Sequence, residues 1–374
     1  MKLTSPKFGE AEIANLRSCL NSGWVTQGPM TAKFEQKVAE RHRTKYGLAT
    51  TSCTAALHLA VLALEIDAGD EVIVPAFTWV TSANCAEYVG ARVVFADIDP
   101  NTYNLDPAAF EAAITNRTRA VVVAHLFGLS AEMDAILAIA QARNIAVIED
   151  AACAIGTTYK GVPVGAFGKV GCFSFHPRKI VTTGEGGMVT TNDDAIARRI
   201  GSLRNHGASA GLDGDKPWSM NRFEMLGYNF RFSDIQAAVG LAQMERLEGL
   251  IAERRQVARR YNDLLQDVDG LRLPTAGDAA GHTYQSYVVR LRSGGRERRN
   301  ALMVRLQEHG IQTRPGTHAV HNLGYYQRKY DLRREDFPVA ANAEDSTVTL
   351  PIFPDMTEED QEFVVSAILS EMRK

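Results

Sequence analysis

The sequence predicts an α/β protein, in which a large domain with a mostly parallel central sheet flanked by helices precedes a smaller α+β domain. Two observations predict this class. Short runs rich in valine and isoleucine alternate with helical patterns from about residue 45 to residue 200, and the alternation then stops. The chain has 374 residues, 45% hydrophobic and 23% charged, which is enough for two globular domains with a large core.

The strands expected in the first region are short and apolar, as strands buried on both faces of a parallel sheet are. They cover Glu71–Pro75, Arg92–Asp97, Ala120–Leu126 and Ala146–Asp150. The helical patterns that accompany them lie at Thr54–Leu64, Trp79–Tyr88, Pro107–Ile114 and Met133–Arg143. Strand and helix in repeated alternation indicate a mostly parallel sheet.

The pattern changes after this region. Two further strands, Val170–Phe175 and Gly187–Thr191, are joined by the loop HPRKIVTTGEG, and a long helical region follows from about Ser233 to Leu265. Beyond it lie a strand candidate and two helices, at Tyr284–Leu291, Arg296–His309 and Glu358–Met372. We expect a large domain of residues 1–245, including the N-terminal segment, and a small domain of residues 246–374.

Composition and charge exclude several classes of protein. The net charge of -3 offers no general basic surface for nucleic acid. The first residues do not resemble a secretory leader, and no apolar run approaches the roughly 20 residues that span a bilayer. The cysteines are odd in number and form no CxxC pair, which fits a cytoplasmic protein better than a disulfide framework or a zinc site. They are Cys19, Cys53, Cys85, Cys153 and Cys172, and we expect no metal.

Two short segments at element ends are candidates for ligand binding. The first is the polar turn TSCTAA that begins at Thr51, before an apolar helix. Unpaired N–H groups at a helix start bind phosphate, although Ser and Thr there are also ordinary N-caps. The second is Glu149-Asp150 at the end of a strand, where ligands gather in open α/β sheets. A carboxylate at that place either faces a site or caps a loop.

The third segment is FSFHPRK, which ends at Lys179 and is followed by TTGEGG. A single lysine is usually a solvated charge, but this one follows an apolar strand by four residues and so lies near the carboxyl edge of the sheet. A lysine amine in a partly desolvated pocket can condense with an aldehyde. Pyridoxal phosphate (PLP) needs such an amine, N–H donors for its phosphate and a carboxylate for its pyridine nitrogen. Trp79, at another strand end, is available to stack on its ring.

These segments belong to a longer series of motifs in a recognisable order. With them, the chain resembles almost end to end the DegT/DnrJ/EryC1/StrS family of sugar aminotransferases, a group of fold-type I PLP-dependent transferases. The motifs are SGWVTQGP (Ser22–Pro29), TSCTAALHLA (Thr51–Ala60), GDEVIVPAFTWV (Gly69–Val80), DIDPNTYNLDP (Asp97–Pro107), VIEDAA (Val147–Ala152), FSFHPRKIVTTGEGG (Phe173–Gly187) and GYNFRFSDIQAAVGLAQ (Gly227–Gln243).

The resemblance implies catalytic roles for two residues. Lys179 matches the lysine that binds the cofactor and shuttles protons, and Asp150 matches the partner of the pyridine nitrogen. It also implies cofactor contacts: Thr54, Ala55 and Ser174 at the phosphate, Trp79 stacked on the ring, and Asn229 at the phosphate of a neighbouring subunit. The expected active unit is therefore a homodimer with shared active sites. Three residues match positions that contact the nucleotide-sugar or line the pocket, although loop histidines are also common at plain surfaces: Arg314, His318 and His321.

One residue departs from the family pattern. Three residues after the aspartate, the family carries His or Gln in contact with the cofactor, and here the residue is Cys153. A thiol is a weaker hydrogen-bond donor than either side chain. We retain Cys153 among the expected cofactor contacts, and Lys179 still indicates the reaction class.

The expected reaction is transfer of the amino group of L-glutamate to a nucleotide-linked 4-keto-6-deoxy sugar. The products are a 4-amino-4,6-dideoxy sugar nucleotide and 2-oxoglutarate, in the synthesis of a polysaccharide or a glycosylated natural product. GDP, UDP and dTDP are all candidate nucleotides. The alternatives are a 3-keto sugar aminotransferase of the same family and a non-catalytic PLP- or sugar-binding regulator. Lys179 argues against a family dehydratase, which carries histidine there, and TSCTAA lacks the GxGxxG turn of a nicotinamide oxidoreductase.

Overall fold

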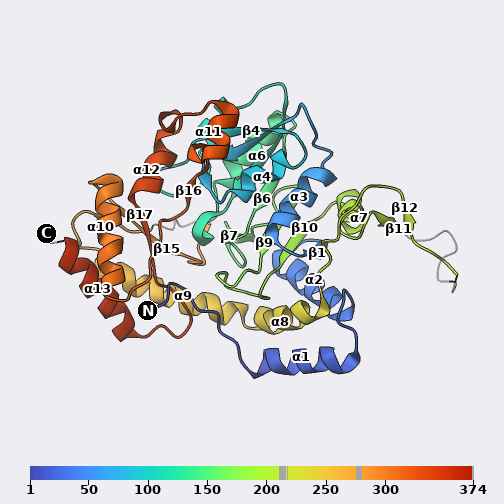
Figure 1. Ribbon diagram of the computed structural model, residues 1–374, viewed down its shortest axis with the longest axis horizontal. Coiled ribbons are helices and arrows are strands. Elements are labelled where there is room, and N and C mark those ends of the chain that lie inside the picture. Colours follow the sequence, from blue (N-terminus) through green and yellow to red (C-terminus); the bar gives the residue numbers. More distant parts are fainter. Residues whose placement is uncertain (210–215, 217, 275–279, 373–374) are drawn as a thin grey trace.

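The computed structural model describes residues 1–209, 216, 218–274 and 280–372, and its centre is a seven-stranded sheet (Figure 1). The strand order is β1-β10-β9-β6-β5-β2-β4. β10 is antiparallel to both β1 and β9, and all other strand pairs of this sheet are parallel, so the predicted mostly parallel α/β sheet is confirmed. The strands are β1 (Tyr46–Thr50), β2 (Glu71–Pro75), β4 (Arg92–Ala96), β5 (Thr118–Ala124), β6 (Ala146–Asp150), β9 (Val170–Ser174) and β10 (Gly187–Thr191).

The strands predicted for this sheet are present within about two residues of their expected ends, but the sequence pattern missed β1. Its sequence, YGLAT, contains a single β-branched residue and so gives little strand signal. The strand forms because it pairs along its whole length with β10, from Tyr46 opposite Thr191 to Thr50 opposite Gly187. Tertiary pairing therefore decides the conformation of this segment.

Helices cover both faces of the sheet, and the alternation of side chains along each strand explains why. Val72 and Val74 of β2 point into one apolar core, whereas Ile73 points into the other. The first core is closed by α3 (Cys53–Ala63), α4 (Thr81–Glu87) and α7 (Asp194–Leu203). The opposite face is covered by α2 (Pro29–His42), α5 (Pro107–Ala112), α6 (Met133–Ala142) and α8 (Asp234–Glu245), with α1 (Glu10–Ser22) packed outside α8.

A separate core lies towards the C-terminus, around an antiparallel sheet of order β13-β15-β17. The predicted long helical region is two helices, α8 and α9 (Leu247–Leu265), because Arg246 leaves helical geometry with φ -99° and ψ 0°. This break and the separate core support a boundary at residue 246, which we keep as a proposal. The core contains α9, β13 (Leu271–Arg272), β15 (Tyr287–Leu291), α10 (Gly295–Glu308), β17 (Thr347–Leu350) and α13 (Glu358–Met372).

The chain does not divide cleanly at that residue, because later segments return to the first core. β16 (His318–Ala319) pairs with β3 (Phe77–Thr78), and α11 (Gly324–Tyr330) and α12 (Pro338–Ser346) bury Tyr326 and Ala340 in the first core. Conversely, the carbonyl of Leu3 accepts a hydrogen bond from the N–H of Ile352 beside the second core. The shorter elements are β7 (Thr158–Tyr159), β8 (Val162–Pro163), β14 (Ala280–Gly281) and the 3₁₀ turns Leu126–Gly128, Val320–Asn322 and Arg334–Asp336.

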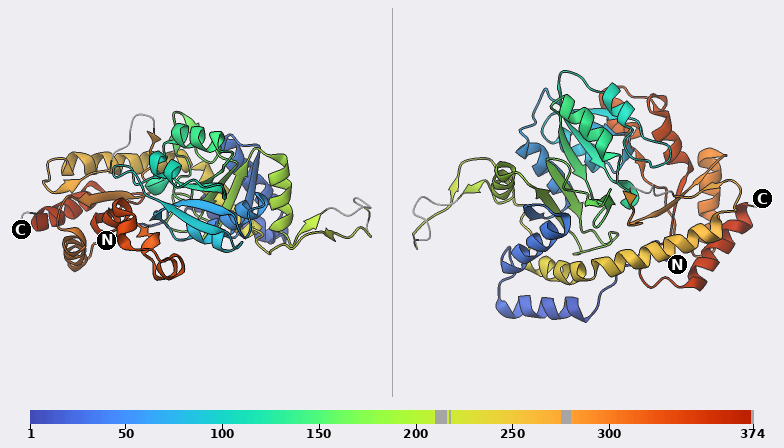
Figure 2. Two further views of the ribbon diagram at one scale, coloured as in Figure 1. Left: turned by 90° about the horizontal axis from the view of Figure 1, so that it is seen from above. Right: turned by 180° about the vertical axis from the view of Figure 1, so that it is seen from behind.

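An arm projects from the body of the molecule. It carries β11 (Ala208–Ser209) and β12 (Arg222–Phe223), and all views show it extending away from the sheet and its helices (Figures 1 and 2). Among its described residues, Trp218, Met220 and Leu226 expose large apolar side chains to solvent. No helix in the described parts of the chain is long and apolar enough to cross a membrane.

Candidate active site

The strand register brings the predicted site segments to one edge of the sheet. Asp150 and Ser174 close the parallel strands β6 and β9. Gly187 stands opposite Ser174, and Thr50 stands opposite Gly187, so the turn that leads into α3 lies at the same edge. A Cβ atom on Gly187 would lie 2.3 Å from the carbonyl carbon of Ser52, so only glycine permits this close approach.

Asp150 is 6% exposed, and two hydrogen bonds orient its carboxylate. Its Oδ2 accepts from Ser82 Oγ at 2.6 Å, and its Oδ1 accepts from the Ala152 N–H at 3.1 Å. Because Ser82 gives its proton to Asp150, the Thr78 hydroxyl donates to Ser82 Oγ at 3.0 Å. Sequence reasoning missed Ser82, since a serine among the small residues of a helix carries no distinctive signal.

Lys179 is half-buried and meets the segment that follows Asp150. Its Nζ donates to Cys153 Sγ at 3.0 Å, and its backbone N–H donates to the carbonyl of His176 at 2.8 Å, which closes the turn after β9. The residue that departs from the family pattern is therefore the one in contact with the candidate lysine.

The start of α3 is capped by a side chain of its own. Ser52 Oγ accepts from the N–H of Ala55 at 3.1 Å, and the carbonyl of Ser52 accepts from the N–H of Ala56 at 3.0 Å. The ordinary N-cap interpretation therefore holds for Ser52, next to the half-buried Thr54. A phosphate bound by the Ala55 N–H would replace this cap at the positive end of the helix dipole.

Trp79 and His318 lie side by side and form one exposed wall of the site. Pairing of β16 with β3 places His318 opposite Thr78, and the rings of Trp79 and His318 have centroids 5.5 Å apart. His321 lies elsewhere, fully buried, with its ring 4.8 Å from that of Phe337. The structure thus gives His318 access to a ligand and places His321 in the core.

Arg314 offers a donor that no group in the described parts of the chain uses. Its Nε is buried without a hydrogen-bond partner there, while its carbonyl accepts from the N–H of Thr349 at 2.7 Å. Burial lowers the pKa of its guanidinium, and the nearby Cys153 opposes that shift. A fixed, partly desolvated guanidinium is well suited to bind a carboxylate or a phosphate.

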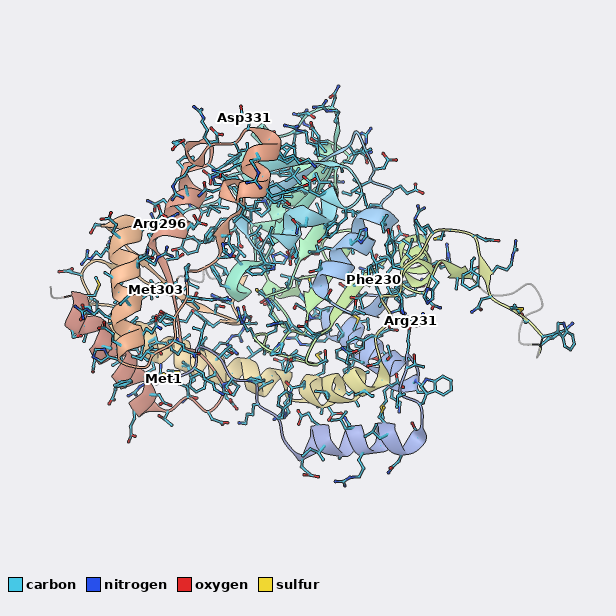
Figure 3. All side chains as sticks on the ribbon, viewed as in Figure 1. Met1, Phe230, Arg231, Arg296, Met303 and Asp331 are labelled. Carbon is cyan, nitrogen blue, oxygen red and sulfur yellow. The ribbon has the colours of Figure 1, made fainter. Side chains whose placement is uncertain are left out.

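Asn229 lies at the root of the arm and is exposed. The adjoining residues Phe230 and Arg231 mark that root in Figure 3, and the Thr51 N–H donates to the carbonyl of Phe230 at 3.2 Å. A hollow of about 470 Å³ beside Arg231, between α2 and α7, is lined by none of the predicted site residues. The chemistry therefore gathers at the sheet edge and not in this hollow.

Cys153 is expected to be the first cysteine to react with a small alkylating reagent in the native protein. The other four thiols are buried, and burial raises the pKa of each, that of Cys85 to about 12. Since the thiolate is the reactive form, we expect them to react at least about tenfold more slowly. Peptide mass spectrometry after brief iodoacetamide treatment checks this, with Cys153→Ser as the control. Equal labelling of Cys53 and Cys153 would contradict it.

Comparison with known proteins gives the same assignment. The model of the DegT/DnrJ/EryC1/StrS aminotransferase family matches residues 6–369. The chain belongs to this family. It is 39% identical over 97% of its length to the spore coat polysaccharide biosynthesis protein SpsC of Bacillus subtilis, covering 95% of that protein. It is 37% identical over 98% of its length to the GDP-perosamine synthase of Caulobacter vibrioides, covering 97% of it.

Solved structures of similar proteins support the same fold and the same cofactor for this chain. The putative sugar aminotransferase Spr1654 of Streptococcus pneumoniae, in its PMP form, superposes with a TM-score of 0.95 at 26% identity, over 100% of this chain and 99% of that one. The aminotransferase TlmJ of Streptoalloteichus hindustanus superposes with a TM-score of 0.92 at 31% identity, over 100% and 99%. The predicted family, fold type and enzyme class are confirmed, and the protein is a PLP-dependent aminotransferase.

The residues at the sheet edge of this protein fit PLP. An amine at Lys179, an oriented carboxylate at Asp150 and the positive end of α3 meet at one sheet edge, next to the exposed indole of Trp79. These are the groups that a pyridine aldehyde with a phosphate requires. Lys179 and Asp150 would hold the two ends of the ring, and the first turn of α3 would hold the phosphate.

Proposed function

We propose that this aminotransferase moves the amino group of L-glutamate onto a nucleotide-linked 4-keto-6-deoxy sugar. The observation that carries the proposal is that Lys179 Nζ lies at the same sheet edge as Asp150 and contacts Cys153, the residue that also lies near the guanidinium of Arg314. One relative of nearly the same length is named GDP-perosamine synthase, and another is named for spore coat polysaccharide biosynthesis. Both names support a sugar as the amino acceptor.

The chain's own residues supply proton transfer and orientation. When bound, PLP provides the electron sink that stabilises a carbanion. The Lys179 amine would then carry protons between the carbon atoms of the amino acid, the cofactor and the sugar. The Cys153 sulfur accepts a hydrogen bond from that amine at 3.0 Å and so holds it in place. The Asp150 carboxylate, oriented by Ser82 and shielded from water, would hold the pyridine nitrogen and favour its protonated form.

Binding of an anionic substrate falls to Arg314 and the exposed wall. Both L-glutamate and a nucleotide-sugar carry oxyanions that a guanidinium can bind with two parallel hydrogen bonds. The Nε of Arg314 has no hydrogen-bond partner in the described parts of the chain and is available as one of the two donors, and the exposed ring of His318 is available to the sugar or the base. We place His321 outside this set because its ring is buried against Phe337.

We further propose a homodimer in which Asn229 completes the partner's site. The support is the arm, because large apolar side chains on a projecting element favour burial against another surface. Met220 and Leu226 are 83% and 84% exposed in the single chain, and Asn229 lies exposed at the arm's root. In a homodimer, a second copy of the chain supplies that surface.

Replacing Leu226 with serine is expected to shift the protein towards monomers and to weaken cofactor retention. Removing one buried leucine from an interface costs about 2–4 kcal/mol, and a homodimer carries the substitution in both copies, so the dimer should be at least about 30-fold weaker. Analytical ultracentrifugation and the PLP content after dialysis measure the two effects. Val304→Ser on α10, also an exposed apolar residue, is the control. Asn229→Ala should lose cofactor while remaining dimeric, and a fully active monomer would refute the shared site.

Mass spectrometry of the sugar product tests the substrate. PLP-loaded protein is mixed with L-glutamate and a panel of GDP-, UDP- and dTDP-linked 4-keto-6-deoxy sugars, together with 3-keto isomers. Conversion of one 4-keto member to its amine supports the proposal and identifies the nucleotide. Conversion of a 3-keto member alone replaces it with the 3-amino assignment. Cofactor binding without any conversion favours a binding protein on the same fold.

A further inference from the structure

A buried polar strap joins the two cores next to Lys179. We define the strap as residues 282–286, between β14 and β15. Its buried members are His282, Thr283, Gln285 and Ser286, and none of these side chains is a typical core residue. Tyr284 in its middle has φ 50°, a left-handed conformation that disfavours residues other than glycine. A buried polar run with a strained centre indicates a defined role at this junction.

The strap is fixed to the large domain by backbone hydrogen bonds. The Thr283 N–H donates to the carbonyl of Gly128 at 3.0 Å, and the Ser286 N–H donates to the carbonyl of Phe127 at 3.2 Å. The hydroxyls of Thr283 and Thr157 lie 3.1 Å apart. The strap is therefore held rigidly where the Gln285 side chain leaves it.

The Gln285 side chain reaches the peptide group that carries Lys179. Gln285 is 6% exposed, and its Nε2 donates to the carbonyl of Arg178 at 2.8 Å. The N–H of the same peptide group, that of Lys179, donates to the carbonyl of His176 at 2.8 Å. Because a peptide group is planar, holding both its oxygen and its nitrogen fixes its rotation. The direction in which the Lys179 side chain leaves the backbone is fixed with it.

A buried arginine supports Gln285 from the other side. Arg254 of α9 is 2% exposed, and its Nη1 donates to the carbonyls of Gln285 at 3.1 Å and Tyr284 at 3.3 Å. None of the ion pairs in the described parts of the chain involves Arg254, and burial lowers the pKa of its guanidinium to about 10. A buried charge without a counter-ion is expensive. Here the hydrogen bonds to the two strap carbonyls stabilise the buried guanidinium and hold the strap in place.

We propose that Gln285 is a positioning residue for Lys179, and that Arg254 of α9 holds Gln285 in place. The small domain thereby sets the direction of the amine at the edge of the large domain's sheet. The inference deepens the same site and rests on Lys179 acting as the proposed function requires. Its test uses the bound cofactor and no sugar, so a wrong sugar assignment leaves it unaffected.

The test measures how strongly Lys179 competes for the cofactor with an added amine. PLP-loaded protein is titrated with methoxyamine, and the visible absorption of the cofactor gives the equilibrium constant for displacement of Lys179. A lysine that is no longer fixed has a lower effective concentration at the cofactor, so Gln285→Ala should favour displacement by about tenfold. Gln285→Glu, of the same size but without the donor, should act in the same direction.

The control is Gln361→Ala. Gln361 is a buried glutamine whose Nε2 donates to the carbonyl of Val257 at 2.9 Å in the second core, so its replacement also removes a buried side-chain hydrogen bond to a backbone carbonyl. We expect its methoxyamine equilibrium to stay within about twofold of the parent protein. A parent-like equilibrium in either folded Gln285 variant overturns the proposal. An equal shift in Gln361→Ala would also overturn it, because the effect would then follow stability and not position.

Discussion

Lys179→Ala is expected to lower the rate of amino transfer by at least about 10³-fold, which is within the range that a positioned general base or acid contributes. The variant loses the amine that lies 3.0 Å from Cys153 Sγ, and no other lysine in the described parts of the chain forms a hydrogen bond to Cys153. Alanine leaves the turn after β9 intact, because the hydrogen bond to His176 comes from the backbone of residue 179. The measurement is the single-turnover rate with L-glutamate and the sugar accepted by the parent protein.

A second readout separates lost chemistry from lost binding. Borohydride reduction should attach one cofactor covalently to the parent protein and none to the variant, as intact-protein mass spectrometry will show. Lys169→Ala is the matched control, since Lys169 is exposed on the loop before β9 and should keep full activity and full attachment. A Lys179→Ala protein with the parent rate would remove the basis of the proposed function.

Glu149→Gln is expected to lower the free energy of unfolding by about 3–5 kcal/mol, a large fraction of the stability of a typical domain. Glu149 is fully buried behind the active-site edge. Its Oε2 accepts from the Gly165 N–H at 2.6 Å, and its Oε1 accepts from the N–H groups of Phe167 at 2.8 Å and Gly168 at 2.7 Å. An amide would turn an N–H₂ group towards these donors and leave some of them without an acceptor.

The fourth donor to Glu149 is His125, which lies 3.0 Å away through Nε2. Its Nδ1 accepts from the N–H of Ala131 at 3.2 Å, so Nε2 carries the proton. The His125 backbone N–H also donates to the carbonyl of Asp150 at 3.0 Å, so the variant should loosen the end of β6 as well.

Urea denaturation followed by fluorescence measures the effect of Glu149→Gln. Glu248→Gln is the control, because Glu248 is exposed in its ion pair with Arg41 and should change stability by no more than about 0.5 kcal/mol. Equal midpoints for the two variants would show that the buried hydrogen bonds of Glu149 do not stabilise the fold.

Much of the fold and the candidate site could be predicted because the signals are local. Valine-rich runs predicted most strands of the main sheet, and the parallel order followed from their alternation with helices. Lys179 and Asp150 lie at strand ends, where the carboxyl edge of an open sheet collects ligands. The structure places Cys153 in contact with Lys179, a contact that the two residues' separation in sequence does not reveal.

Other features had no local signal. β1 forms because β10 pairs with it, and the long helical region expected from about Ser233 to Leu265 divides into two helices at Arg246. His321 could be read as a ligand from its loop sequence, yet its ring is buried against Phe337. Hydrophobic periodicity indicates which residues of a segment are buried, but it does not identify the neighbouring residues that they pack against.

The sequence by itself therefore determined the class of this protein: its α/β sheet, its family, its cofactor chemistry and the lysine and aspartate that we expect to perform it. These depend on residue type and on spacing within short segments. Only the tertiary structure decided how those residues are held, through Ser82 on Asp150, Cys153 on Lys179 and Gln285 on the peptide before it. Gln285 and Arg178 are 107 residues apart in the chain, and such a contact exists only after both cores have packed and brought them together.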